Sequence, residues 1–219
     1  MTDPILGEFS AAVFDLDGTL FDSMYFWNHI DEVFLNQVGI DEVPEDYLLA
    51  IAHLGAEETA LYTKERFGLD MGPEEMMRIW SDEAHEFYKN SVTLKTGAYE
   101  YLKKLYDGGV KLAVATASSE DLFLPGMKRT GIDGFFTAIA AVGECARKKG
   151  FPDVYRLACR RLGVPDSEAI VFEDIYMAVK GAKDGGFRTV GVYDETSGRD
   201  TELIRSTADL FITDFTELL

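Results

Sequence analysis

Residues 11–19 of this 219-residue chain read Ala11-Ala12-Val13-Phe14-Asp15-Leu16-Asp17-Gly18-Thr19, and they carry the strongest signal for its fold. The first four of these residues are apolar, and a short apolar run that ends at a glycine turn is typical of a strand buried on both faces. The carboxylates of Asp15 and Asp17 follow that strand directly. Ligands bind at the carboxyl ends of the strands in an open α/β sheet, so we expect a ligand site here.

The two carboxylates are one residue apart, and the turn after the strand can bring both into one small site. Like charges that are held close repel each other, so they need a cation or a shared proton. Mg²⁺ prefers oxygen ligands and suits such a pair. Asp-Gly is also a common turn signal, so this motif alone leaves a plain turn open.

The composition predicts a packed globular protein without a membrane-spanning segment. Hydrophobic residues make up 47% of the chain, and no apolar stretch is long enough to cross a bilayer. The first residues lack the basic flank and apolar core of a signal peptide. Cys145 and Cys159 belong to no metal-binding pattern, so we expect free thiols in a cytoplasmic protein, with a single bridge left open.

The formal net charge of -18 argues against two classes of partner. Non-specific nucleic-acid binding needs a basic surface, and anionic lipid repels an acidic chain. We therefore expect neither nucleic acid nor a membrane as a partner. The same field repels an anionic substrate, so a phosphate site would need a metal and at least one well-placed Lys or Arg.

The order of the patterns predicts an α/β core that a helical insert interrupts. Only helical patterns occur in the insert, at residues 23–38, 45–52, 56–67 and 73–89. Apolar strands then alternate with helices, which indicates a parallel sheet covered on both faces; these strands are expected at 111–116, 138–142, 169–172, 189–192 and 210–212. We predict an α/β fold: a Rossmann-like, doubly wound parallel core over 1–22 and 91–219, with an inserted all-α cap domain over 23–90.

Two further motifs could bind phosphate near the ends of predicted strands. Thr116 ends the strand 111–116, and its hydroxyl and the backbone N–H of Ala117 can bind a phosphate oxygen. A Ser/Thr cap of the next helix would explain the same residues. Lys148 and Lys149 precede a helix start at Pro152, where a cation can hold a phosphoryl group. A solvated basic loop is the alternative there.

A fourth motif, the acidic pair Glu173-Asp174, ends the apolar run that precedes it. Two acids at the end of a buried strand are costly unless they meet a metal or a cation. An acidic cap of the following helix is the alternative. In chain order the motifs are therefore two aspartates, a Thr, a Lys and an acidic pair, all at one edge of one sheet.

This set of motifs resembles the haloacid dehalogenase superfamily, in particular its phosphatase and β-phosphoglucomutase-like branch with an α-helical cap. Asp15-Leu16-Asp17-Gly18-Thr19 matches the first motif of that family in full. Thr116 matches the hydroxyl of the second motif, Lys149 the lysine of the third, and Glu173-Asp174 the acids of the fourth. The resemblance covers nearly the whole chain, including the place of the insert after the first motif.

The resemblance implies a Mg²⁺-dependent phosphatase that acts on a small phosphorylated metabolite through an aspartyl-phosphate. Asp15 is then the nucleophile, and Asp17 the general acid and then the general base. The metal ligands are then an Asp15 oxygen, the backbone carbonyl of Asp17, and Asp174. Glu173 would act through a water or orient this set.

The resemblance also implies how the phosphoryl group is held. Thr116, Lys149 and the backbone N–H groups of Leu16 and Ala117 would neutralise charge on its oxygens. The usual Gly-Lys-Pro-x-Pro-Asp of the third motif reads Lys148-Lys149-Gly150-Phe151-Pro152-Asp153 here, so we expect Lys149 in the site and leave Lys148 open. Ile175 stands where Ser often follows the acidic pair, which removes a hydrogen-bonding side chain beside the ligands.

Two other functions compete with hydrolysis. A β-phosphoglucomutase-like sugar phosphomutase typically holds a second phosphate with an Arg in a Gly-x-Ser-Arg segment, but the similar place here reads Gly55-Ala56-Glu57-Glu58. Acids in place of a cation favour hydrolysis over phosphate transfer within a sugar. A non-catalytic phosphate-binding module has no chemical need for the intact carboxylates and lysine. The sequence leaves the oligomeric state open.

Overall fold

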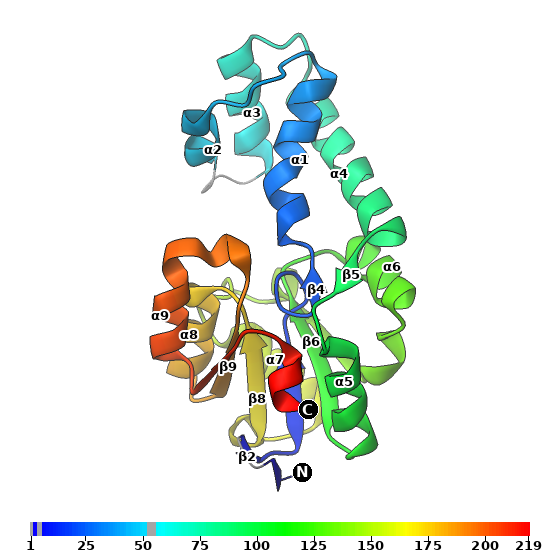
Figure 1. Ribbon diagram of the computed structural model, residues 1–219, viewed down its shortest axis with the longest axis vertical. Coiled ribbons are helices and arrows are strands. Elements are labelled where there is room, and N and C mark those ends of the chain that lie inside the picture. The colour runs from blue at the N-terminus through cyan, green and yellow to red at the C-terminus, as the bar shows by residue number, and fades with distance from the viewer. Residues whose placement is uncertain (1, 4–5, 52–55) are drawn as a thin grey trace. The chain divides into compact units, whose positions relative to one another are not determined.

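Six parallel strands form the central sheet of this computed structural model, which describes residues 2–3, 6–51 and 56–219 (Figure 1). Their order across the sheet is β10-β9-β8-β3-β6-β7. The strands are β3 (Ala11–Phe14), β6 (Lys111–Thr116), β7 (Ala138–Ala141), β8 (Ala169–Glu173), β9 (Arg188–Val192) and β10 (Leu210–Ile212). The chain adds β6 and β7 on one side of β3 and then β8, β9 and β10 on the other. The predicted doubly wound sheet is confirmed, and its order reverses at β3, where such sheets bind ligands.

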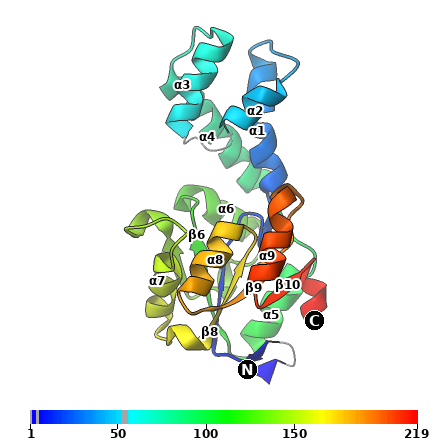
Figure 2. The ribbon, with the colours of Figure 1, turned by 90° about the vertical axis from the view of Figure 1, so that its left-hand side faces the viewer.

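Helices cover both faces of this sheet, as right-handed crossovers between parallel strands require. One face carries α7 (Asp153–Leu162), α8 (Tyr176–Asp184) and α9 (Thr201–Thr207) (Figure 2). The other face carries α5 (Ala98–Asp107) and α6 (Glu120–Thr130). The turns between these elements contain the short 3-10 helices η1 (Asp133–Phe135), η2 (Val142–Glu144), η3 (Asp166–Glu168), η4 (Glu195–Asp200) and η5 (Phe215–Leu218).

Both faces of β3 are buried, which explains its unbroken apolar sequence. Val13 belongs to the core cluster that also contains Ala158 of α7. On the opposite face, Phe14 stacks on Phe172 with 4.4 Å between ring centroids, and Tyr101 of α5 packs against the same Phe172 ring. The rigid strand therefore fixes the position of the residue that follows it, Asp15.

Among the described residues, two short antiparallel pairs lie outside the central sheet, and neither was predicted. β1 (Thr2–Asp3) pairs with β2 (Gly7–Glu8), and β4 (Phe21–Asp22) pairs with β5 (Thr93–Leu94). Strands of two residues are too short to carry an alternating pattern, so the sequence contains no signal for them. The second pair joins two segments that lie on either side of the helical insert in the sequence.

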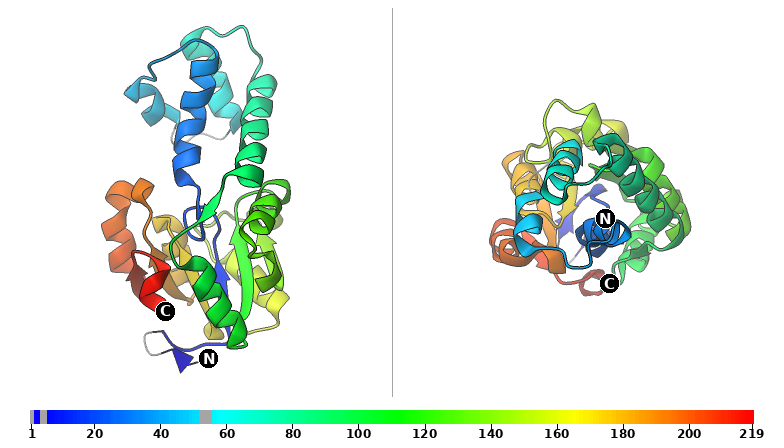
Figure 3. Two further views of the ribbon diagram at one scale, coloured as in Figure 1. Left: turned by 45° about the vertical axis from the view of Figure 1, so that its right-hand side comes forward. Right: turned by 90° about the horizontal axis from the view of Figure 1, so that it is seen from above.

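The chain forms two compact units. The first comprises Met1–Met24 and Val92–Leu219, and the second comprises Tyr25–Ser91. The helices of the second unit are α1 (Met24–Gln37), α2 (Glu45–Ile51), α3 (Ala56–Phe67) and α4 (Pro73–Asn90). Its core includes Phe34 of α1 and Trp80 of α4, whose rings meet edge to face, and these helices run side by side (Figure 3). Among the described residues, no helix is both long and apolar enough to cross a membrane.

Candidate active site

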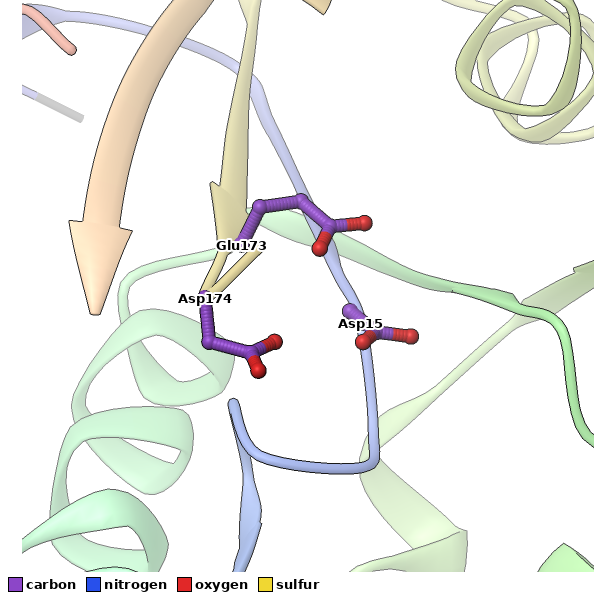
Figure 4. Close-up of side chains that lie close together, drawn as sticks. All are labelled: Asp15, Glu173 and Asp174. Atoms are coloured by element: carbon purple, nitrogen blue, oxygen red, sulfur yellow. The ribbon is translucent and has the colours of Figure 1, made fainter. Parts of the chain in front are cut away.

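Three buried carboxylates meet at the carboxyl ends of β3 and β8 (Figure 4). Asp15 extends the pairing of these strands by one residue, since its backbone N–H donates to the carbonyl of Phe172 at 3.1 Å. Glu173 is the last residue of β8 and Asp174 is the next. Each of the three offers an oxygen that lies within 4.8 Å of the others. The close contact of two neighbouring strands therefore brings together residues that are far apart in the chain.

The turn after Asp15 depends on Gly18, which has a φ of 79°. That left-handed conformation favours glycine. A Cβ atom on Gly18 would also lie 2.2 Å from Oδ2 of Asp174. The next residue, Thr19, donates its hydroxyl to Oδ1 of Asp174 at 2.8 Å. Gly18 and Thr19 thus hold the first motif against the acidic pair of the fourth.

Lys149 provides positive charge at the carboxylate cluster. Its Nζ pairs with Oδ1 of Asp15 and lies 2.7 Å from Oε1 of Glu173, and only 13% of its side chain is exposed. Lys148 is exposed instead. The structure therefore brings the expected lysine to the cluster, and the alternative of a solvated loop is wrong for Lys149. A Cβ atom on Gly181 of α8 would lie 2.6 Å from the Lys149 carbonyl oxygen, so this glycine allows the Lys149 backbone to approach the helix.

Glu173 has one oxygen held by the protein and one without a partner. Tyr155 of α7 donates its hydroxyl to Oε1 at 2.8 Å. Oε2 is buried and has no hydrogen-bond partner within the described part of the chain. Sequence reasoning missed Tyr155, because an aromatic residue on the apolar face of an amphipathic helix gives the same signal as an ordinary core residue.

Both carboxylate oxygens of Asp17 accept hydrogen bonds from serine hydroxyls. Ser23 donates to its Oδ1 at 2.7 Å and Ser118 to its Oδ2 at 2.6 Å. Thr116 is buried, and its Oγ1 accepts the backbone N–H of Ser118 at 3.0 Å. The N-cap of α6 is Ser119, so Thr116 is not the cap of that helix. Sequence reasoning gave Ser23 and Ser118 no role, since a lone hydroxyl next to a motif carries no specific signal.

The other predicted residues have these positions. The side chain of Leu16 is buried, and its carbonyl accepts N–H groups from Thr19, Leu20 and Phe21 within a tight loop. Ala117 is exposed after β6. The N-cap of α8 is Ile175, with no side-chain cap, so the acidic pair does not cap that helix. Glu57 and Glu58 lie exposed in the first turn of α3, and Gly55 lies outside the described residues.

Burial and the nearby charge of Glu173 raise the pKa of two of the acids, Asp15 and Asp174. Burial and then the charge of Glu173 hold the pKa of Asp15 well above its usual range, although Lys149 opposes this. The same two causes raise the pKa of Asp174 to about 7, against the hydrogen bond from Thr19. Burial lowers the pKa of Lys149, but Asp15 and Glu173 outweigh it, so the net shift is upward. The lysine therefore remains charged but does not balance three carboxylates.

The donor set suits a hard divalent cation. All three acids offer oxygen ligands, and the orphaned Oε2 of Glu173 is a buried acceptor that lacks a donor. Mg²⁺ takes such oxygen ligands and relieves repulsion between carboxylates. The geometry of these residues thus fits a Mg²⁺ ion, with Lys149 as a second source of positive charge.

Known proteins resemble this chain in sequence and in fold. The profile of the haloacid dehalogenase-like hydrolases matches residues 12–192. Pyrophosphatase PpaX of Bacillus velezensis is 30% identical over 88% of this chain and 87% of its own. CbbY of Rhodobacter sphaeroides in complex with phosphate has a TM-score of 0.77 at 24% identity and covers 96% of each chain. A β-phosphoglucomutase of Clostridium difficile has a TM-score of 0.68 at 20% identity, covering 96% of this chain and 93% of its own.

Proposed function

The chain belongs to the haloacid dehalogenase-like hydrolase family, and we propose that it is a Mg²⁺-dependent phosphatase that works through an aspartyl-phosphate. One observation carries the proposal: the buried Asp15 carboxylate lies beside Glu173, Asp174 and the ammonium of Lys149. A carboxylate nucleophile splits one difficult displacement at phosphorus into two easier steps.

In the first step, an oxygen of Asp15 attacks phosphorus and the bond to the leaving alcohol breaks. Asp17 protonates the departing oxygen, and the hydroxyls of Ser23 and Ser118 orient its carboxyl group for this transfer. In the second step, Asp17 takes a proton from water while that water attacks phosphorus. The bond between phosphorus and Asp15 then breaks and inorganic phosphate leaves.

Positive charge lowers the barrier of both steps. Lys149 and Thr116, with the backbone N–H groups of Leu16 and Ala117, would hold the phosphoryl oxygens. Mg²⁺, held by Asp15, the Asp17 carbonyl and Asp174, would offset the charge of the acids and the phosphate. Glu173 would orient this set or act through a water. A formal net charge of -18 makes this local compensation necessary, because the protein as a whole repels anions.

We also propose that the second unit acts as a cap that selects a small phosphorylated substrate. The relative from Bacillus velezensis is named a pyrophosphatase, so pyrophosphate belongs among the candidates. The acids Glu57 and Glu58 have the wrong charge to hold a second phosphate, which favours water over a sugar hydroxyl as the acceptor. Both cysteines are free, which supports a cytoplasmic location.

The test is a screen of pyrophosphate and phosphorylated metabolites with Mg²⁺, following inorganic phosphate. We expect phosphate release by the wild type and none by Asp15→Asn, which is nearly isosteric but lacks the nucleophile. An acid-quenched wild-type reaction should carry one phosphoryl group on the peptide that contains Asp15. Losing a covalent nucleophile should leave at most about a few per cent of the wild-type turnover. A higher turnover by Asp15→Asn would refute the role of Asp15 as the nucleophile.

A second assay separates hydrolysis from the mutase alternative. The protein is incubated with Mg²⁺ and β-glucose 1-phosphate, with and without a glucose bisphosphate. Phosphate and glucose 6-phosphate are then measured separately. Efficient formation of glucose 6-phosphate with little free phosphate would identify a mutase and overturn the proposal.

A further inference from the structure

A largely buried ion pair, Lys95 with Asp194, lies outside the carboxylate cluster. Nζ of Lys95 lies 2.7 Å from Oδ2 of Asp194 and donates to the carbonyl of Tyr193 at 2.7 Å. Only 10% of the Lys95 side chain and 5% of the Asp194 side chain are exposed. Burying two charges away from water is costly, and burying one charge without its partner is more costly still. The proposed reaction does not use either residue.

Asp194 connects this pair to Asp174. Its Oδ1 accepts the backbone N–H of Thr196 at 2.9 Å and the hydroxyl of Thr196 at 2.6 Å, which shapes the start of η4. Within η4, Ser197 donates its hydroxyl to the backbone carbonyl of Asp174 at 3.1 Å. Lys95 therefore acts through Asp194 on η4, and η4 contacts the backbone of Asp174, a proposed metal ligand.

The backbone of Lys95 connects to the other ligand-bearing segment. Its N–H donates to the carbonyl of Leu20 at 2.9 Å, next to the pairing of Leu94 with Phe21. Leu20 in turn donates its N–H to the carbonyl of Leu16 at 2.9 Å, within the loop that carries the first motif. One residue thus contacts the first-motif loop with its backbone and the Asp174 turn with its side chain.

We infer that Lys95 is a positioning residue that holds the Asp15 and Asp174 segments at one spacing, through Leu20 on one side and Asp194 on the other. This inference rests on the proposed Mg²⁺ site. Mg²⁺ demands near-ideal octahedral geometry, so a change in the spacing of its ligands lowers its affinity. Substituting a residue that orients metal ligands from outside the coordination sphere typically lowers metal affinity by roughly 10- to 100-fold.

The test measures Mg²⁺ affinity by calorimetry and stability by urea unfolding on the full-length protein. Lys95→Met leaves the Asp194 charge buried and unpaired, so we expect a lower urea midpoint and weaker Mg²⁺ binding. The double variant Lys95→Met/Asp194→Asn removes one charge of each sign and keeps an oxygen that can accept from Thr196. We expect the urea midpoint of the double variant to recover towards that of the wild type, while its Mg²⁺ dissociation constant stays about tenfold above the wild-type value.

A matched control is Lys111→Met. Lys111 also donates to a backbone carbonyl, that of Leu162 at 2.9 Å, but it lies at the start of β6, at the opposite edge of the sheet. We expect wild-type Mg²⁺ affinity in this variant. An unchanged affinity in the double variant would show that Lys95 only stabilises the fold. A double variant that loses affinity without recovering its midpoint also overturns the inference, because general loosening explains it.

The outcomes separate this inference from the proposed reaction. A wild type that binds Mg²⁺ but hydrolyses no phosphate ester refutes the reaction alone, and the comparison of Mg²⁺ affinities still decides the role of Lys95. A wild type that binds no Mg²⁺ overturns the inference about Lys95, since there is then no ligand spacing to hold.

Discussion

Gly181 offers a sharp test of how the fold positions Lys149. It lies inside α8, where replacing a glycine with alanine normally favours the helix by about 1 kcal/mol. Here the added Cβ would lie 2.6 Å from the carbonyl oxygen of Lys149 and 2.6 Å from the carbonyl carbon of Gly150. Both are backbone atoms, so no side-chain rotation relieves the overlap. The helix and the lysine loop must move apart by about 1 Å to restore ordinary van der Waals contact.

This displacement should cost more in catalysis than in stability. Overpacking typically costs about 1–3 kcal/mol, and the gain in helix propensity offsets about 1 kcal/mol of that. We therefore expect Gly181→Ala to lose at most about 2 kcal/mol of unfolding free energy and to stay folded. Lys149 bridges Asp15 and Glu173, and a misplacement near 1 Å can lower turnover about 100-fold. We expect kcat to fall by roughly 10- to 100-fold.

The assay compares kcat with the urea-unfolding free energy for Gly181→Ala and for a control, Gly134→Ala. Gly134 lies in η1, and a Cβ there would have no neighbour within 4 Å. The control should keep wild-type turnover and gain up to about 1 kcal/mol from the reduced freedom of its unfolded chain. A Gly181→Ala protein with wild-type turnover and raised stability would refute the argument that this glycine positions the lysine.

Three further predictions concern the site itself. Lys149→Ala should lower kcat about 100-fold or more, the scale of one electrostatic stabiliser, and Lys148→Ala much less; steady-state kinetics showing the reverse ranking would contradict the observed pairing. Tyr155→Phe removes the hydroxyl that holds Glu173 and should weaken Mg²⁺ binding about tenfold, and unchanged calorimetric affinity would show that Glu173 needs no such support. Burial and the charge of Glu173 raise the pKa of Asp174 from 3.8 to about 7, so this carboxyl group is protonated at pH 6. Mg²⁺ binding to Asp174 should therefore release a proton, and the Mg²⁺ affinity should rise between pH 6 and pH 8. A dissociation constant for Mg²⁺ that does not change with pH would contradict this prediction.

The central sheet could be predicted because each of its strands carries its own local signal. Residues 112–115 form an apolar run that is followed by the hydroxyl of Thr116, and the structure has β6 at Lys111–Thr116. The helix predicted at 73–89 corresponds to α4, which starts at Pro73, and proline suits the first turn of a helix. By contrast, α9 and the pairing of β4 with β5 were missed. These elements are short, and contacts with distant residues stabilise them more than their own periodicity does.

The candidate site could be predicted only where a charged side chain directly follows a buried strand of the parallel sheet. Asp15, Glu173 and Asp174 are conspicuous because a charge that follows a buried apolar strand is costly without a partner. Parallel strands then bring such residues to one edge of the sheet, so spatial proximity follows from the order of the motifs. Tyr155 and Gly181 lack this signal, because an aromatic residue and a glycine in helices have many ordinary explanations.

The electrostatics of the site show why these hidden residues matter. Lys149 pairs with Asp15 and Glu173, yet burial and the charge of Glu173 still raise the pKa of Asp15 and of Asp174, so a second cation would stabilise these two carboxylates. A site of this kind loses function through small displacements, because Coulomb energies in a buried environment change steeply with distance. Gly181 sets how closely the lysine loop approaches α8, Tyr155 holds Glu173, and Lys95 links the two ligand-bearing segments. Substitutions at these three positions should therefore change metal affinity or turnover without altering any group that reacts.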